Sequence, residues 1–370
     1  MKKRLVCLIG MLSSAIILVS GCGPQASTRV ESSQDVKPTI GKIHHGSSEF
    51  QPIQYNKKLG LLGTTPGVLP NEVPKGYPSF PQTNDNYQPG RVVVLKTNTY
   101  LPQMDPEFGY QPSYLYSSGN WLCWIYLSMG IGPDDGERVY AYNVSTKKEF
   151  QVWAPPKDSN EQLMEVHLLG NDLFLGLQGS SGNTVNTKVV EVKLDTKRQT
   201  VLFSEQGQQD HNVIEDFAVW NNKIALIYTP ATHFMGESSL TSRGEPYSIV
   251  MYRLNGGKIR NLYSGYNINS FDFCSGKDGF IWSSKTSGVK YYDISKGEVL
   301  SVSRDSSYVY ADDSVILWRG INDSKKGLFS TNTDKMIPFP VEERNSVPEL
   351  LGDMIIFRHS GSKYDWAYIS

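Results

Sequence analysis

Three polar residues at the starts of apolar strands are the strongest candidates for chemistry in this sequence. Glu165, Asp216 and Asn269 each open an apolar run at a similar place in a repeated pattern. Carboxylate and amide oxygens are ligands for hard cations such as Ca²⁺. One interpretation is therefore a polar ring that binds a ligand or a cation. The alternative is that polar strand starts simply line a water-filled channel.

A long loop supplies the second candidate site. Residues 230–246 join two predicted strands with far more residues than a turn requires, and they include His233, Phe234 and Arg243. Loops of this length are commonly functional. We expect either a loop that contacts a partner or ligand, or a surface decoration without a binding role.

Other chemistry-bearing residues give weaker signals. The run Pro133-Asp134-Asp135-Gly136-Glu137 lacks the alternating ligand spacing of a calcium-binding loop, which favours a solvated acidic turn. His44-His45 has no cysteine or carboxylate cluster near it in the sequence, and no Gly-x-Ser-x-Gly nucleophile motif occurs. The sequence therefore predicts no catalytic residues, no metal ion and no cofactor, and it favours a protein that is not an enzyme.

The candidate residues lie on a repeat of short apolar strands and turns that begins near residue 91. In each copy a turn rich in Asn, Asp or Gly precedes a strongly apolar strand. The first apolar residues of the six copies are Trp121, Leu173, Ile224, Phe280, Val315 and Met354. Their separations run from 35 to 56 residues, which is the range of β-propeller blades.

A second polar turn follows in five of the copies and fits an outer hairpin. These turns lie at 142–147, 192–197, 252–257, 292–297 and 329–334. Each of these five copies therefore supplies four strands, and repeated four-stranded antiparallel sheets predict an all-β fold, a six-bladed β-propeller.

The sixth copy reaches Tyr368 without a fourth strand, which would leave an edge open to further pairing. We expect the apolar, β-branched segment at 91–98 to supply that strand and to close the ring. The alternative is a separate strand in the N-terminal extension. In the layout of its repeats and hairpins, 91–370 resembles the bacterial class of six- to eight-bladed extracytoplasmic propellers, and the resemblance points to no particular family.

The ring makes a prediction about two cysteines. Cys123 falls in the first copy and Cys274 in the fourth, so the two residues lie on opposite sides of a six-fold ring. A disulfide needs Cα atoms within about 7 Å of each other. We therefore predict two buried free thiols.

The first 22 residues have the pattern of an export signal. A basic start, Met1-Lys2-Lys3-Arg4, precedes an apolar stretch that is too short for a typical transmembrane helix. The segment Val19-Ser20-Gly21-Cys22 then resembles the lipobox of bacterial lipoproteins. The resemblance implies cleavage before Cys22 and attachment of a diacylglyceryl group, with acyl chains such as palmitate, to its sulfur.

These patterns divide the chain into three parts. We expect a lipoprotein signal peptide at 1–21, a lipidated tether and proline-rich extended segment at 22–90, and the propeller at 91–370. Seven prolines between residues 46 and 90 forbid long helices or central strands there. Several leucines and valines in the same stretch predict that part of it lies extended against the propeller.

The amino-acid composition limits the classes of partner that this protein is expected to bind. The formal net charge is −1 and no basic run occurs, which argues against a nucleic-acid partner. We expect a lipoprotein on the extracytoplasmic side of the cell membrane, anchored through Cys22. Its propeller is expected to be a non-catalytic binding or scaffolding platform for an envelope protein or glycan. The alternative is an envelope hydrolase or lyase that acts on glycan, lactone or peptide at a channel mouth.

Overall fold

Alternating apolar residues and tight turns produce β-sheet almost throughout the part of the chain that the structure describes. The computed structural model describes residues 40–47, 52–56, 61–64, 67–68, 87–88, 92–94, 99–100, 112–127, 137–157, 159–208, 211–235, 244–276, 278–305, 307–312, 315–320, 325–340, 343, 345–351, 354–359 and 363–369. One 3₁₀ helix, η1 (Ala231–Met235), interrupts the strands. Within these residues no helix has the length and hydropathy needed to cross a membrane. The predicted all-β class is confirmed.

Six sheets of four antiparallel strands match the six predicted blades. Blade 1 contains β8 (Pro112–Ser118), β9 (Trp121–Leu127), β10 (Glu137–Asn143) and β11 (Lys148–Trp153). Blade 2 contains β12 (Gln162–Leu169), β13 (Asp172–Ser181), β14 (Thr184–Lys193) and β15 (Arg198–Gly207). Blade 3 contains β16 (Asn212–Trp220), β17 (Lys223–Pro230), β18 (Pro246–Arg253) and β19 (Lys258–Tyr266).

The other three blades follow the same plan. Blade 4 contains β20 (Ile268–Gly276), β21 (Gly279–Ser284), β22 (Gly288–Asp293) and β23 (Glu298–Ser303). Blade 5 contains β24 (Ser307–Asp312), β25 (Val315–Gly320), β26 (Lys326–Ser330) and β27 (Lys335–Ile337). Blade 6 contains β28 (Val347–Leu351), β29 (Met354–Arg358), β30 (Lys363–Tyr368) and, from the N-terminal part of the chain, β1 (His44–Ser47).

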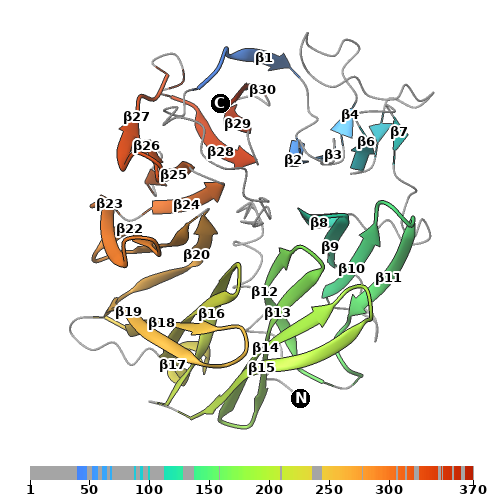
Figure 1. Cartoon of the computed structure of the whole chain (residues 1–370), viewed down its shortest axis with the longest axis vertical. Coiled ribbons are helices and arrows are strands. Elements are labelled where there is room, and N and C mark those ends of the chain that lie inside the picture. The colour runs from blue at the N-terminus through green and yellow to red at the C-terminus, as the bar shows by residue number, and fades with distance from the viewer. Residues whose placement is uncertain are drawn as a thin grey trace, which may run out of the picture.

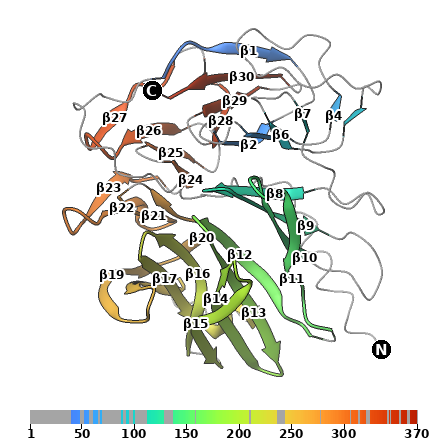
Figure 2. The same cartoon turned by 45° about the vertical axis from the view of Figure 1, so that its right-hand side comes forward.

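The blades stand around a centre with their first strands innermost (Figure 1). The first strands of successive blades contact one another from β8 through β28. The core lies between the blades, since each apolar cluster takes side chains from two neighbours: Ile125 and Val139 of blade 1, for example, pack with Val166 and Leu168 of blade 2. Face-to-face packing of twisted sheets in this way holds the ring together. The view turned by 45° shows β24 to β27 of blade 5, and β28, β29, β30 and β1 of blade 6, in order from the centre outward (Figure 2).

The strand that completes blade 6 is not the one that the sequence analysis selected. β1 pairs antiparallel with β30, from His44 opposite Trp366 to Ser47 opposite Lys363. The expected closing segment at 91–98 instead contributes β6 (Val92–Val94), which pairs with β3 and β7. The prediction that an N-terminal strand closes the ring is confirmed, but the predicted position of that strand is wrong. A short polar segment is sufficient to close the ring because backbone hydrogen bonds make the pairing.

A further four-stranded sheet stands in the ring beside the six predicted blades. This N-terminal sheet contains β2 (Pro52–Asn56), β3 (Leu61–Thr64), β6 and β7 (Thr99–Tyr100), and the small pair β4 (Gly67–Val68) and β5 (Tyr87–Gln88) lies between its strands in sequence. β2 contacts both β8 and β28, so the sheet lies between blades 1 and 6. Residues 52–56 and 61–64, which precede the predicted propeller start at residue 91, form two strands of this sheet.

The two cysteines are free and buried, as predicted. Cys123 lies in β9 of blade 1 and Cys274 in β20 of blade 4. Burial raises the pKa of the Cys123 thiol, so this side chain acts as a small apolar core residue.

Candidate functional site

Two of the predicted site residues, Glu165 and Asp216, occupy the same position in neighbouring innermost strands. The ladder of β12 shifts register between Leu163 and Glu165, and the ladder of β16 shifts between Ile214 and Asp216. Such a β-bulge turns the following side chain away from its regular direction. Each carboxylate then accepts a hydrogen bond from the next backbone N–H: Glu165 Oε1 from Val166 at 3.0 Å, and Asp216 Oδ1 from Phe217 at 2.6 Å.

His167 joins the two strands that carry these acids. Its imidazole is 1% exposed, and Nε2 donates to the carbonyl oxygen of Phe217 at 2.7 Å. The His167 and Phe217 rings also pack edge to face, with centroids 4.8 Å apart. His167 therefore packs in the interior of the ring. Because Phe217 directly follows Asp216 and His167 lies two residues after Glu165, this contact holds the two carboxylate-bearing segments side by side.

A third acid, Glu137, approaches Glu165 from blade 1. Glu137 is the first residue of β10, where it pairs with Leu127. Burial raises the pKa of Glu137 to about 7. Burial also raises the pKa of Glu165 to about 7, with the charge of Glu137 acting in the same direction and the Val166 N–H opposing it. The expected solvated acidic turn at 133–137 is therefore wrong for Glu137, which lies in a strand; the rest of that run falls outside the described residues.

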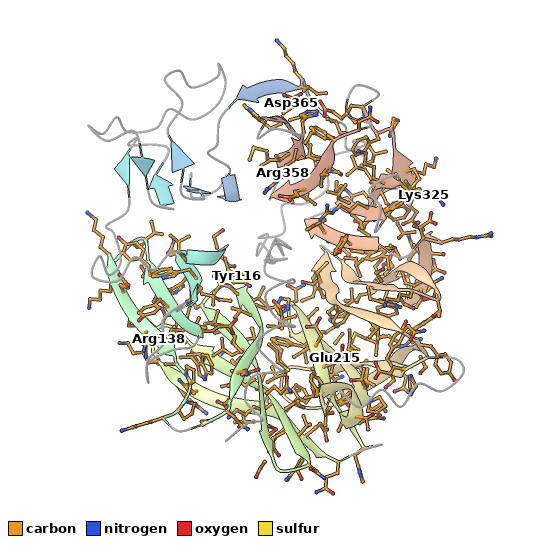
Figure 3. All side chains as sticks on the ribbon, turned by 180° about the vertical axis from the view of Figure 1, so that it is seen from behind. Tyr116, Arg138, Glu215, Lys325, Arg358 and Asp365 are labelled. Atoms are coloured by element: carbon orange, nitrogen blue, oxygen red, sulfur yellow. The ribbon has the colours of Figure 1, made fainter. Side chains whose placement is uncertain are left out.

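Glu215 adds a fourth acid that the sequence analysis missed. It is the extra residue of the β16 bulge, between Ile214 opposite Tyr228 and Asp216 opposite Ile227. Glu215 is 7% exposed and Asp216 is 5% exposed. Figure 3 shows Glu215 on its inner strand. We call the four acids Glu137, Glu165, Glu215 and Asp216, which lie on β10, β12 and β16 of blades 1 to 3, the acidic mouth.

Asn269 does not occupy the matching place in blade 4. The last residue of the first strand gives a common reference point in blades 2, 3 and 4, because it closes the first hairpin of its blade. These residues are Leu169, Trp220 and Gly276, which pair with Asp172, Lys223 and Gly279 respectively. Counting back four residues from each gives Glu165, Asp216 and Asp272. Asn269 lies three residues earlier, opposite Ser283, because the β20 ladder is irregular between Asn269 and Cys274. A sequence comparison aligned on strand starts cannot detect such an irregularity.

The predicted partner loop is partly built into the body of blade 3. His233 and Phe234 lie in η1. Phe234 packs against Val185, Val213 and Ala231, so it anchors the start of the loop to an apolar cluster shared with blade 2. Arg243 lies outside the described residues.

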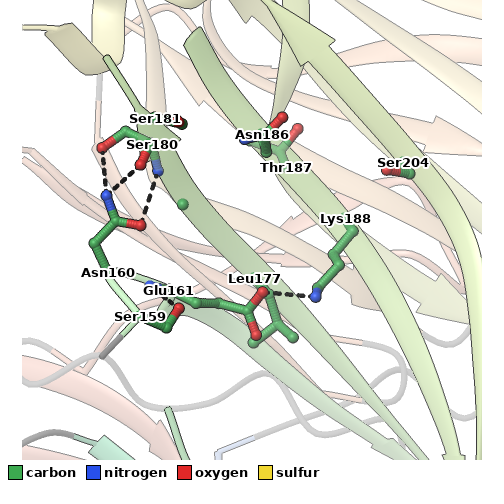
Figure 4. Close-up of a pocket in the computed structure, with 11 residues that line it drawn as sticks. Ser159, Asn160, Glu161, Leu177, Ser180, Ser181, Asn186, Thr187, Lys188 and Ser204 are labelled. Atoms are coloured by element: carbon green, nitrogen blue, oxygen red, sulfur yellow. Dashed lines mark hydrogen bonds and ion pairs between the residues drawn. The ribbon is translucent and has the colours of Figure 1, made fainter. Parts of the chain in front are cut away.

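A polar pocket lies in blade 2 where β12 begins (Figure 4). Its volume is about 270 Å³, and it is lined by Ser159, Asn160, Glu161, Leu177, Gly179, Ser180, Ser181, Asn186, Thr187, Lys188 and Ser204. Asn160 donates to the hydroxyl of Ser180 at 2.9 Å, and Lys188 forms an ion pair with Glu161 at 2.6 Å. Hydroxyls, amides and one ion pair in a concave surface are suited to hydrogen-bonded polar ligands.

Comparisons with known proteins concern the fold. No protein-family model and no curated protein matches the chain. Three solved structures show the kind of likeness found. An oligogalacturonate lyase in complex with manganese is 12% identical over 95% of this chain and 98% of that chain, with a TM-score of 0.49. The β-propeller domain of the Trilobed protease from Pyrococcus furiosus, which has an open velcro topology, is 6% identical over 89% and 93%, with a TM-score of 0.49. TolB from Acinetobacter baumannii is 11% identical over 76% and 75%, with a TM-score of 0.42.

Proposed function

We propose that this chain is a lipid-anchored lipoprotein on the extracytoplasmic side of the cell membrane, whose β-propeller is a non-catalytic binding platform. The lipobox-like Val19-Ser20-Gly21-Cys22 supports the anchor. The observation that carries the proposal is the place of β1. This closing strand begins at His44, 22 residues after Cys22. A fully extended segment of that length reaches at most about 75 Å. The anchor is therefore joined to blade 6 through one short segment of chain.

The binding surface of this platform is the end of the ring that carries the acidic mouth and the polar pocket. The pocket offers Ser, Thr and Asn side chains together with the Lys188–Glu161 ion pair. These groups match the hydroxyls and amides of a glycan or of a polar protein surface. The partner class that we propose is therefore an envelope glycan or envelope protein bound over this end.

The Glu137–Glu165 pair favours a second candidate, an envelope hydrolase or lyase acting on glycan, lactone or peptide. Each group has a pKa raised to about 7, chiefly by burial. Carboxyl groups that titrate near neutral pH are suited to general acid–base catalysis. Under this candidate, Glu137 or Glu165 would exchange a proton with the substrate at the mouth.

The anchor is tested with labelled palmitate in a bacterial host that produces the full chain. Wild type is expected to carry the label, and the Cys22→Ala variant is expected to carry none. Cys7→Ala is the matched control and should be labelled like wild type, because Cys7 lies in the segment that cleavage removes. An unlabelled wild-type chain, or label retained in Cys22→Ala, would contradict the anchor.

The platform is tested by photocrosslinking in the same cells. A crosslinking residue replaces Lys188 at the pocket, and a control replaces Ser145 in the exposed turn between β10 and β11. One dominant adduct from position 188 that is absent from position 145 supports the platform. Turnover in a screen of glycans, lactones and peptides that is lost in Glu165→Gln would instead establish the second candidate.

A further inference from the structure

Three side chains with metal-ligating atoms converge in blade 6, away from the acidic mouth of blades 1 to 3. Glu343 lies between β27 and β28, His359 directly follows β29, and Asp365 lies within β30. Their ligand atoms all lie within 4.8 Å of one another. His359 Nε2 is 3.3 Å from Glu343 Oε2 and 3.2 Å from Asp365 Oδ2. These residues are far enough apart in the chain that only the fold brings them together.

Glu343 has the feature that a simple ion pair does not explain. Its side chain is 1% exposed, and Oε2, whose ion-pair partner is His359 Nε2 at 3.3 Å, makes no regular hydrogen bond among the described residues. A buried carboxylate oxygen without a hydrogen bond is costly unless a cation compensates it. The backbone at Glu343 is fixed by its turn, since its carbonyl oxygen accepts bonds from Ser346 N at 3.1 Å and from Ser346 Oγ at 2.8 Å. The oxygen is therefore held toward the cluster.

The charge of the cluster also calls for a cation. Two carboxylates face one imidazole, so the three side chains carry net negative charge whenever both carboxylates are ionised. The neighbouring cation Arg358 is engaged by Glu349, with Nη2 2.7 Å from Oε2. A divalent ion would neutralise the two carboxylates and bind the imidazole at once.

We propose that Glu343, His359 and Asp365 form a binding site for a divalent transition-metal ion, with Zn²⁺ as the first probe. One imidazole and two carboxylates are ligands that Zn²⁺ accepts at about 2.0–2.2 Å. Two ligands at that distance and at a tetrahedral angle lie about 3.3–3.5 Å apart. The two separations from His359 Nε2 already have nearly this value, so metal binding needs little rearrangement. Imidazole is a poor ligand for Ca²⁺, which takes oxygen.

Because the site lies in blade 6 beside the closing strand, a bound ion would have a structural role in closing the ring. Asp365 stands directly opposite His45 of β1 in the ladder, and Figure 3 shows Asp365 next to that strand. An ion here would connect the entry into blade 6, the β29–β30 connection and the strand on which β1 pairs. A ligand that binds only the folded state stabilises it. Zn²⁺ is therefore expected to protect the closure of the ring.

The test uses the full chain, purified in detergent without a histidine tag and stripped with a chelator. Isothermal titration calorimetry is expected to show one Zn²⁺ per chain. The Tm is expected to rise by about 5 °C at a free Zn²⁺ concentration a hundred times the Kd. His359→Gln and Glu343→Gln are expected to weaken binding at least about tenfold and to remove the rise in Tm. Ca²⁺ is expected to give no comparable shift.

Matched variants keep the result interpretable. His211→Gln and Glu298→Gln alter an exposed histidine and an exposed glutamate elsewhere and are expected to bind Zn²⁺ like wild type. Asp365→Asn replaces any ligand variant that fails to fold, as judged by circular dichroism. A wild-type chain that binds no Zn²⁺, or binding unchanged in every ligand variant, would overturn the proposal.

Discussion

The carboxyl group of Glu165 makes the stability of the ring depend on pH. Burial, with the charge of Glu137 in addition, raises its pKa in the folded state to about 7, while the unfolded chain has the ordinary value of 4.5. Between these values the folded chain retains a proton that the unfolded chain has lost. Stability therefore falls as the pH rises through this window, and the whole penalty is present above pH 7.

Replacing Glu165 with Gln should remove this penalty without removing the acceptor for the Val166 N–H. We expect the variant to be about 1–3 kcal/mol more stable than wild type near pH 8, and nearly equal to it near pH 4.5. Thermal unfolding at the two pH values measures the difference. Glu298→Gln, which changes an exposed glutamate of β23, is the control and should show no such dependence. A Glu165→Gln variant less stable than wild type at both pH values would contradict the assigned cause.

Single residues were predictable from sequence only where the strand pattern itself exposed them. Glu165 and Asp216 were found because each interrupts an apolar strand at the same point of a repeat. Glu137 was misassigned to a loop because its neighbours in sequence are acidic, whereas its neighbour in space is Glu165 in the next blade. The Glu343–His359–Asp365 cluster leaves no trace in a linear pattern, because a connection and two strands separate its members.

At the scale of elements, the repeated sequence pattern determines the turn geometry of the outer hairpins. Four of the five predicted turns share a left-handed residue at the same place, with φ of 56° at Lys147, 59° at Lys197, 70° at Gly297 and 51° at Asp334. In the turn of blade 3 the left-handed residue, Gly256, lies one position earlier. A side chain opens the turn: Asn143 Oδ1 accepts from Ser145 N at 3.0 Å and from Thr146 N at 2.9 Å. The predicted turns at 142–147 and 292–297 were identifiable because these residue types favour this geometry. The bulges of β12 and β16 were not, since no residue type specifies them.

Exchanging the left-handed residues should change stability in opposite directions. Lys147 is exposed, and a side chain at φ 56° is strained, so Lys147→Gly is expected to stabilise the fold by about 0.5–1 kcal/mol. Gly297→Ala is expected to destabilise it by about 1 kcal/mol. A methyl group there meets Arg260 Nη1 only at 3.5 Å, so backbone strain is the cause. Denaturant midpoints measure both, and a loss of stability in Lys147→Gly would contradict the account.

At the scale of the whole molecule, closure of the ring is where the sequence was least informative. The repeat correctly gave six four-stranded blades and a last blade that borrows a strand from the N-terminal side. It selected the apolar 91–98 segment because apolar, β-branched residues favour strands. The actual donor, His44–Ser47, is polar and short, and it is held by its ladder with β30. Ile40 and Ile43, just before it, pack against the apolar cluster between blades 5 and 6.

Removing this closing strand should therefore weaken the whole ring. A chain that begins at residue 48 loses the β1–β30 ladder, the bridge between Ile40 and Ile369, and the packing of Ile40 and Ile43. We expect a loss of about 3–5 kcal/mol and a fall in Tm of roughly 5–10 °C. The exposed edge of β30 should also cause association that increases with protein concentration.

A chain that begins at residue 36 is the matched control, because it lacks the proposed export signal but keeps β1. It should remain a monomer with the higher Tm. Adding a synthetic peptide of residues 36–50 to the shorter chain should restore much of the lost stability, since the peptide can pair with β30 as an added strand. Light scattering and thermal unfolding report both effects. Equal Tm values and monomeric behaviour in the two chains would show that β1 does not close the ring, and would also remove the link that joins Cys22 to blade 6.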